Sequence, residues 1–236
     1  PGQAWRSLLT SVAVGLAASY FFRSRGQIAA AEARAQQARR TAAEQQLRLL
    51  QSQLEPHMLF NTLANLRVLI GADPPRALVM LDALIDFLRS TLDASRTTMH
   101  PLSAEFARCD DYLALMRVRM GARLVTEASL PPELAGEPVP TLLLQPLVEN
   151  AVKHGLEPKV DGGRITIAAH RDAGSLVLTV RDSGLGPGEP AATSGFGLAQ
   201  VRERLATIYG EAASLTLAAD PAGGAVATVR LPLTTP

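Results

Sequence analysis

Apolar positions in the first part of the chain recur at the spacing of an amphipathic helix. Residues 26–70 are rich in Ala, Gln, Arg and Glu, a composition typical of helix. Their apolar stripe begins with Leu47, Leu50 and Leu54. The pair Asp73-Pro74 then supplies an N-cap and a first-turn proline for a second helix, whose apolar stripe runs over residues 78–88. The pattern predicts an antiparallel helical hairpin, and because a lone hairpin leaves an apolar face uncovered, we expect two copies to form a four-helix bundle.

Beyond residue 99 the hydrophobic pattern alternates between helix and strand periods. We expect a helix over residues 103–116, with Ser103 as its N-cap. The other expected elements are a strand over 123–129, a helix over 139–155, strands over 164–170 and 176–181, a helix over 197–209, and a hairpin of 215–218 with 225–231. Strands on one side of a core and helices on the other predict an α+β sandwich.

Length and composition fit two domains. With 236 residues and 47% hydrophobic content, the chain can bury a sizeable core. The net charge of +1, from 23 basic and 22 acidic residues without a dense patch, gives no support to direct nucleic-acid binding. The one cysteine, Cys109, cannot form an internal disulfide, and we interpret it as a packing residue in a reducing compartment.

The N-terminal stretch from Ser7 to Phe22 contains no charged residue over 16 positions, and Arg23 and Arg25 follow it. As a helix it would span about 24 Å against a hydrocarbon core of about 30 Å, so it needs interfacial help from Trp5 or Arg6. We interpret it as a membrane span whose following arginines keep the rest of the chain in the cytoplasm. A signal-peptide core and a buried helix are the alternatives. Because the sequence does not start with methionine, we expect upstream spans or a sensor to be missing.

Three short segments together form a candidate magnesium-nucleotide pocket. The first is an apolar helical run that presents Glu149, Asn150, Lys153 and His154 within little more than one turn. The others are Asp182-Ser183-Gly184-Leu185-Gly186, after a strand-like stretch, and Gly195-Phe196-Gly197-Leu198, before a helix. Magnesium prefers a few oxygen ligands plus phosphates and water, so Asn150 suits it, and Lys153 one turn later can face a phosphate. The free N–H groups of the last helix favour an anion, and ordinary turn glycines are the alternative explanation of this pattern.

A second chemical feature lies on the upstream helix, where His57 follows Pro56. A neutral imidazole is an adequate nucleophile at about pH 7 toward the terminal phosphate of ATP. Pro56 cannot donate a hydrogen bond to Ser52, so we expect the helix to bend just before the histidine. Asn61 lies one turn beyond His57 on the same face. The alternative is a structural histidine on a helix.

These segments resemble known families. Residues 149–155, 182–186 and 195–198 are similar to the N, G1 and G2 boxes of the GHKL ATPase superfamily, which includes gyrase B, Hsp90, MutL and histidine kinases. Residues 53–63 resemble the phosphoacceptor segment of LytS/YehU-type sensor histidine kinases, and residues 101–105 with Tyr112-Leu113 fit the order of that family. The resemblance covers about residues 47–233, and the motifs in this order are a strong signal.

The resemblance implies a GHKL (Bergerat) α/β sandwich that binds ATP and Mg²⁺. It implies that Asp182 accepts a hydrogen bond from the adenine amino group, that Asn150 binds Mg²⁺, and that Gly184 and Gly186 let the backbone approach the nucleotide. It also makes Asn61 a candidate for positioning water in phosphatase action. The predicted nucleotide-binding set is completed by Lys153, His154, Gly195, Gly197 and Leu198. Eight residues separate Gly186 from Gly195, so we expect a short ATP lid.

Two departures from the family pattern concern the residues around the histidine. Met58 stands where the family usually has phenylalanine, which is a tolerable apolar exchange. No carboxylate follows His57, although many other histidine kinases have one there as a base, and Glu55 lies about 200° around the helix from it. The general base is therefore unassigned, with Glu149 as a candidate.

We expect three regions: residues 1–25 as a membrane span with its flanks, 26–98 as a signalling helix and dimerisation hairpin, and 99–236 as an ATP-binding catalytic domain. The predicted function is that of a homodimeric sensor histidine kinase in the bacterial inner membrane, with its catalytic region in the cytoplasm. It would autophosphorylate His57 from Mg-ATP and transfer the phosphoryl group to an aspartate of a response regulator receiver domain. The alternatives are a GHKL ATPase acting as a conformational switch, which has no need of His57 and Asn61, and a non-catalytic dimerisation scaffold.

Overall fold

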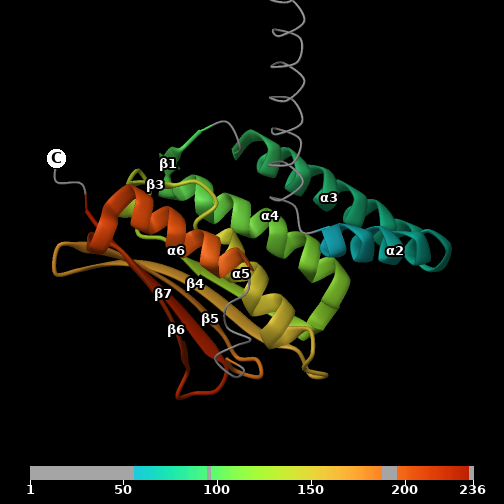
Figure 1. Ribbon diagram of the computed structural model, residues 1–236. Helices are drawn as coiled ribbons and strands as arrows, with labels where there is room; N and C mark the ends of the chain where they lie inside the picture. The colour runs from blue at the N-terminus through green and yellow to red at the C-terminus, as the bar shows by residue number, and fades with distance from the viewer. Residues whose placement is uncertain (1–55, 95–96, 188–195, 234–236) are drawn as a thin grey trace, which may run out of the picture. The chain divides into compact units, whose positions relative to one another are not determined.

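The computed structural model describes residues 56–94, 97–187 and 196–233, which belong to one unit of the fold beginning at Pro56 (Figure 1). The expected membrane span at residues 7–22 and the leucine stripe that starts at Leu47 lie outside these ranges. Within them, no helix combines the length and the apolar character needed to cross a membrane.

Two helices separated by a single residue begin this unit. α2 (Pro56–Ala72) ends directly before Asp73, and α3 (Pro74–Ala94) starts directly after it. The Arg76 N–H donates to Asp73 Oδ1 at 3.2 Å, so Asp73 caps α3 as the sequence predicts. α2 and α3 pack against each other, and the predicted helix pair is therefore present.

The second helix of the pair also packs along α4 (Leu102–Met120), as Figure 1 shows. The rings of Phe87 on α3 and Tyr112 on α4 lie 5.8 Å apart in a tilted arrangement. At the other end of α3, Arg76 Nη2 donates to the Val118 carbonyl at 2.5 Å. The helix pair thus shares a packed boundary with the domain that follows it.

The following domain is built on a five-stranded sheet in the order β2-β4-β5-β7-β6. Its strands are β2 (Leu124–Ser129), β4 (Gly163–Asp172), β5 (Ser175–Asp182), β6 (Ser214–Ala219) and β7 (Ala225–Pro232). β2 and β4 are parallel, and the other neighbours are antiparallel. The predicted hairpin of β6 with β7 is confirmed, and the two predicted strands β4 and β5 are present and pair antiparallel.

Three helices cover one face of this sheet: α4, α5 (Gln145–Asn150) and α6 (Phe196–Tyr209), as seen in Figure 1. The core between the two layers is formed by buried apolar side chains, among them Leu144, Leu147, Ile165, Ile167, Leu178, Val180, Val201, Leu205 and Val229. A small sheet of β1 (Met99–Pro101) and β3 (Pro138–Pro140) and short 3₁₀ turns at Gly121–Arg123, Pro132–Leu134 and Gly210–Ala212 complete the domain. The predicted helical pair followed by an α/β sandwich is confirmed.

Two details of the prediction are wrong at helix starts. Ser103 does not cap α4, because the helix begins at Leu102 and the Ser103 N–H donates to the Ala135 carbonyl at 3.0 Å. The predicted helix over 139–155 starts later, since Pro138–Pro140 is a strand and α5 begins only at Gln145. In both places the backbone finds partners far along the chain, which local periodicity does not reveal.

Candidate nucleotide-binding site

The segment that carries Asn150 changes its helical winding directly after that residue. α5 ends at Asn150, and Ala151–Leu156 continues as a π-helical turn (η3). The Glu157 N–H donates to the Val152 carbonyl at 2.8 Å, five residues back, as this wider winding requires. Lys153 and His154 are exposed on η3, and the side chain of Asn150 is partly exposed. π-turns are often found at functional sites, and this one turns polar residues outward from a buried helix.

Asp182 is the last residue of β5, and its side chain is only 4% exposed. Its Oδ1 accepts a hydrogen bond from the Gly184 N–H at 2.9 Å. Burial raises the pKa of Asp182 above its ordinary value of 3.8, and the nearby Asp220 carboxylate adds to this rise. The N–H groups of Gly184 and Ala225 and the charge of Lys159 oppose it without cancelling it. The carboxylate is thus held in surroundings that favour its neutral form.

Two glycines bring η3 and the turn after β5 into direct contact. A Cβ on Gly155 would lie 2.5 Å from Asp182 Oδ1, and a Cβ on Gly184 would overlap the backbone of Gly155. The Leu185 N–H also donates to the Gly155 carbonyl at 3.2 Å. Only glycine fits at these two positions, so the close approach of the two segments is built into the sequence.

Lys159 also contacts this part of the molecule, although it lies in none of the sequence motifs. Its Nζ donates to the Ser183 carbonyl at 2.8 Å, while the Arg164 N–H donates to Ser183 Oγ at 2.9 Å. These bonds hold the turn of residues 182–186 against β4 and the loop after η3. Lys159 lies 24 residues from Ser183 and in no motif, so no sequence signal points to it. Gly155 does carry a signal, because a glycine inside a helical run is costly unless packing requires it.

The start of α6 lies beside the start of α5. A Cβ on Gly197 would come 3.3 Å from Pro146 Cβ, and Leu198 is buried. Gly195 lies outside the described residues, as does the expected lid before it. The structure therefore brings the motif residues of η3 together with the Asp182 turn, and it sets α6 against the same helix α5.

The predicted phosphoacceptor His57 and its neighbour Asn61 lie on another element, α2. His57 and Asn61 are both on α2, which packs against α3, and the side chain of His57 lies outside the described part. Asn61 is partly buried. The candidate base Glu149 is on α5, where its Oε1 accepts a hydrogen bond from Gln145 Nε2 at 2.7 Å. His57 and Asn61 are therefore on a different element from the residues of the candidate nucleotide site.

The described residues contain no cluster of three or more His, Cys, Asp or Glu side chains that could hold a metal ion. An ion near Asn150 would take one amide oxygen from the protein and its other ligands from elsewhere. Mg²⁺ fits such a site, because it commonly keeps several waters and binds through few protein oxygens together with phosphates.

Two family models match the chain. The model described as histidine kinase matches residues 45–124, and the model described as histidine kinase-, DNA gyrase B-, and HSP90-like ATPase matches residues 137–235. Together the two matches span more than half of the 236 residues. The second match implies ATP binding, and it covers the α5, η3 and Asp182 segments described above.

The curated relatives of this chain include a sensor histidine kinase and a sensor protein. The sensor histidine kinase BtsS of Escherichia coli (strain K12) is 33% identical over 207 residues, which is 87% of this chain and 36% of BtsS. The sensor protein LytS of Staphylococcus haemolyticus (strain JCSC1435) is 31% identical over 182 residues, covering 72% of this chain and 31% of LytS. The chain thus spans about a third of the length of these relatives.

Among solved structures, the histidine kinase domain from the Erythrobacter litoralis EL346 blue-light activated histidine kinase aligns with 80% of this chain and 94% of its own, at 17% identity and a TM-score of 0.46. The two family models and the curated relatives agree with one another over both the helical pair and the sandwich domain. The chain belongs to the histidine kinases, and among them to the sensor kinases of the LytS/YehU type.

Proposed function

We propose that this chain is the kinase region of a two-component sensor, in which His57 takes the terminal phosphoryl group of Mg-ATP. The observation that carries the proposal is the contact of Gly155 and Gly184 around Asp182, in a chain that also presents His57 on a separate helix. A donor site and an acceptor on different elements suit phosphotransfer. A scaffold that only binds partners does not require a nucleotide site and a separate histidine.

Adenine recognition would rest on the turn after β5. The carboxylate of Asp182 is the hydrogen-bond acceptor assigned to the adenine amino group, and Gly184 and Gly186 would approach the nucleotide through their backbone. Gly186 has a φ of 85°, which suits glycine in a tight turn. Lys159 keeps this turn in place through the Ser183 carbonyl.

The phosphates would lie toward the exposed side of η3. Lys153 and His154 supply donors there, and the start of α6 with Gly195, Gly197 and Leu198 supplies backbone N–H groups. Asn150 would bind Mg²⁺, which neutralises phosphate charge when bound. These residues orient the terminal phosphate toward an incoming histidine.

In the transfer itself, a ring nitrogen of His57 forms a bond to the terminal phosphorus, the bond from that phosphorus to the bridging oxygen breaks, and ADP leaves. The proton of the imidazole passes to a base, for which Glu149, oriented by Gln145, is the candidate. The phosphoryl group then moves from His57 to an aspartate of a response regulator receiver domain. Asn61, one turn from His57 on α2, is the candidate for positioning water when the phosphoryl group is hydrolysed instead.

The proposal includes a homodimer and a membrane attachment. Large apolar side chains are exposed along α2 and α3, namely Phe60, Leu63, Val68, Ile70, Leu78, Val79, Leu81 and Ile85. A second copy of the hairpin would cover them and complete the four-helix bundle. The uncharged stretch at residues 7–22 is the proposed attachment to the bacterial inner membrane, with the kinase region in the cytoplasm.

Labelling with γ-phosphate-labelled ATP and Mg²⁺ tests the phosphotransfer. We expect an acid-labile, alkali-stable label on the wild type that is absent from His57→Gln. The matched control is His170→Gln, because His170 is an exposed histidine on β4, and this variant should keep the full label. A wild-type chain that binds ATP but never acquires label would refute the kinase proposal, and so would a His57→Gln variant that still labels.

A further inference from the structure

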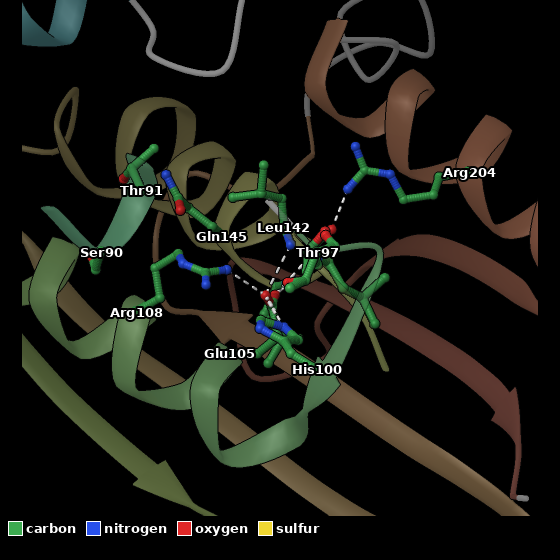
Figure 2. Close-up of polar contacts among 12 residues, drawn as sticks. Ser90, Thr91, Thr97, His100, Glu105, Arg108, Leu142, Gln145 and Arg204 are labelled. Atoms are coloured by element: carbon green, nitrogen blue, oxygen red, sulfur yellow. Dashed lines mark hydrogen bonds and ion pairs between the residues drawn. The ribbon is translucent and has the colours of Figure 1, made fainter. Parts of the chain in front are cut away.

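The most completely surrounded charge in the described domain is Glu105 on α4, which is 0% exposed (Figure 2). Its Oε1 accepts from the Leu142 N–H at 2.9 Å, and its Oε2 accepts from the N–H groups of Leu143 and Leu144, each at 2.7 Å. Arg108 Nη1 donates to Oε1 at 2.7 Å. One carboxylate therefore binds three consecutive backbone N–H groups and a guanidinium.

A further neighbour completes this cluster. His100 Nε2 lies 2.8 Å from Glu105 Oε1, although without the alignment of a hydrogen bond. Burial alone raises the pKa of Glu105, but the His100 contact, the Leu144 N–H and the Arg108 charge outweigh it and keep the pKa below its ordinary value of 4.5. The carboxylate is therefore ionised at neutral pH, as an acceptor of so many donors must be.

The loop that Glu105 binds has a backbone conformation that needs support. Leu142 has a φ of 56°, in the left-handed region that leucine rarely adopts. A left-handed residue beside right-handed ones turns successive N–H groups toward one point, which makes a pocket for an anion. Here the anion is a side chain of the protein itself, so the loop conformation and the carboxylate depend on each other.

This loop leads directly into the helix that carries the proposed magnesium ligand. Leu144 is the N-cap residue of α5, and Asn150 is the last residue of that helix. α5 continues through η3 to Leu156, and the Glu105 contacts hold the start of this helical segment, six residues before Asn150. On the other side of the loop, Thr141 Oγ1 donates to the Thr97 carbonyl at 3.0 Å, and Arg204 on α6 donates to the Thr141 carbonyl (Figure 2).

We propose that Glu105 is a positioning residue for the nucleotide site: by binding the N–H groups of Leu142–Leu144 it fixes the start of α5 and so places Asn150 against the phosphates. This role rests on the proposed function of the chain as a Mg-ATP-dependent kinase. It also has a specific consequence. Asp182 is anchored separately, on β5 and by Gly184, so loss of the Glu105 contacts should weaken phosphate and magnesium binding much more than adenine binding.

The test compares Glu105→Gln with the wild type by two affinities measured on the whole chain, for Mg-ATP and for ADP in the presence of EDTA. Glutamine keeps the side-chain shape but turns an NH₂ donor toward groups that are themselves donors. We expect Mg-ATP to bind about tenfold more weakly and ADP in EDTA to change less than about twofold, with faster amide exchange at residues 142–144. Cys109→Ala is the matched control, because Cys109 is a buried α4 residue outside the Glu105 contacts, and its ratio of the two affinities should equal that of the wild type.

A second variant covers the case in which Glu105→Gln does not fold. His100→Asn keeps the carboxylate but removes the ring that lies 2.8 Å from Glu105 Oε1, so the carboxylate and the loop bound to it are held less firmly. We expect this variant to weaken Mg-ATP binding about threefold with the same selectivity. Equal losses of both affinities, or unchanged affinities with unchanged exchange at residues 142–144, overturn the positioning role. A wild type that binds neither nucleotide overturns the proposed function together with this role, whereas a wild type that binds Mg-ATP beside an unselective Glu105 variant overturns the positioning role alone.

Discussion

Glu105 and Asp182 are two buried carboxylates of the same domain, and the protein treats their charges in opposite ways. Glu105 is 0% exposed and Asp182 is 4% exposed, so burial alone should raise the pKa of both. The pKa of Glu105 is instead held below its ordinary value, because His100, the Leu144 N–H and Arg108 overcome the cost of burial. The pKa of Asp182 stays raised, because burial outweighs its two backbone partners and the charge of Lys159.

We propose that this difference separates a charge that stabilises the fold from one that binds a ligand. The donors around Glu105 come from α4, the residues before it and the loop before α5, so the protein itself meets the needs of that carboxylate. Asp182 lies at the point where η3 and the turn after β5 meet, and its pKa is raised, as is common for functional carboxylates. A ligand that donates a hydrogen bond to Asp182 would stabilise the ionised form of this carboxylate.

The largest effect that tests this comparison is on stability. We expect Glu105→Gln to lower the free energy of unfolding by about 3 kcal/mol, because it leaves Arg108 buried without its anion and turns an NH₂ group toward donors that a carboxylate oxygen accepts from. Urea denaturation measures the change. Glu127→Gln is the control, since Glu127 is exposed on β2 with Arg164 as its partner, and its change should stay within about 0.5 kcal/mol. Similar costs for the two variants would mean that the Glu105 cluster contributes no more than a surface pair.

Asp182→Asn should weaken ATP binding without lowering stability. We expect it to weaken ATP binding by about tenfold to a hundredfold, because it removes a charged acceptor, and to leave the free energy of unfolding unchanged or higher at neutral pH. Calorimetric titration with ATP and urea denaturation of the same samples measure both. Asp172→Asn, an exposed carboxylate at the far end of β4, is the control and should alter neither. A large loss of stability in Asp182→Asn would make that residue a second structural carboxylate and remove the contrast.

The contact between η3 and the Asp182 turn can be tested without changing a charge. Gly155→Ala places a methyl group 2.5 Å from Asp182 Oδ1, so one of the two segments must move. We expect about tenfold weaker ATP binding and a stability loss of about 2 kcal/mol from overpacking. Gly136→Ala is the control, because a Cβ there meets nothing within 4 Å. If Gly155→Ala binds ATP as the wild type does, the tight approach is not a requirement of the site.

The two carboxylates also differ in how far the sequence reveals them. Asp182 stands in a pattern, a strand followed by spaced glycines, and this pattern carries most of the candidate site because glycine positions record close backbone approach. Glu105 has no such pattern, since its main partners are backbone N–H groups 37 to 39 residues away, and any residue type could supply them. The left-handed Leu142 is equally hidden, because leucine does not signal that conformation.

The same reasoning applies to the elements of the fold. Strands β4 and β5 and helix α6 follow strong local periods, so the sequence predicts them well. The apolar run from Val139 onward has no clear period, and pairing of β3 with β1, 39 residues upstream in the Val139–His100 pair, decides that its first residues form a strand. Helix starts at Leu102 and Gln145 likewise depend on contacts that form only in the folded chain.

The smallest expected effect, and the one that isolates the two charges best, is the pH dependence of stability. Because the folded-state pKa of Glu105 lies below 4.5, its contribution is fully present above that pH and is lost as the pH falls through the folded value. Because the folded-state pKa of Asp182 lies above 3.8, its ionised form costs stability as the pH rises through that raised value, and the cost vanishes in acid.

The two variants therefore predict difference curves of opposite sign when urea denaturation is repeated across the acid range. The deficit of Glu105→Gln relative to the wild type should shrink as the pH falls below about 4.5, and any gain of Asp182→Asn should shrink as the pH falls toward about 3.8. Curves of the same sign would mean that the two carboxylates lie in equivalent surroundings. Their ionisation would then give no reason to assign one to the fold and the other to a ligand.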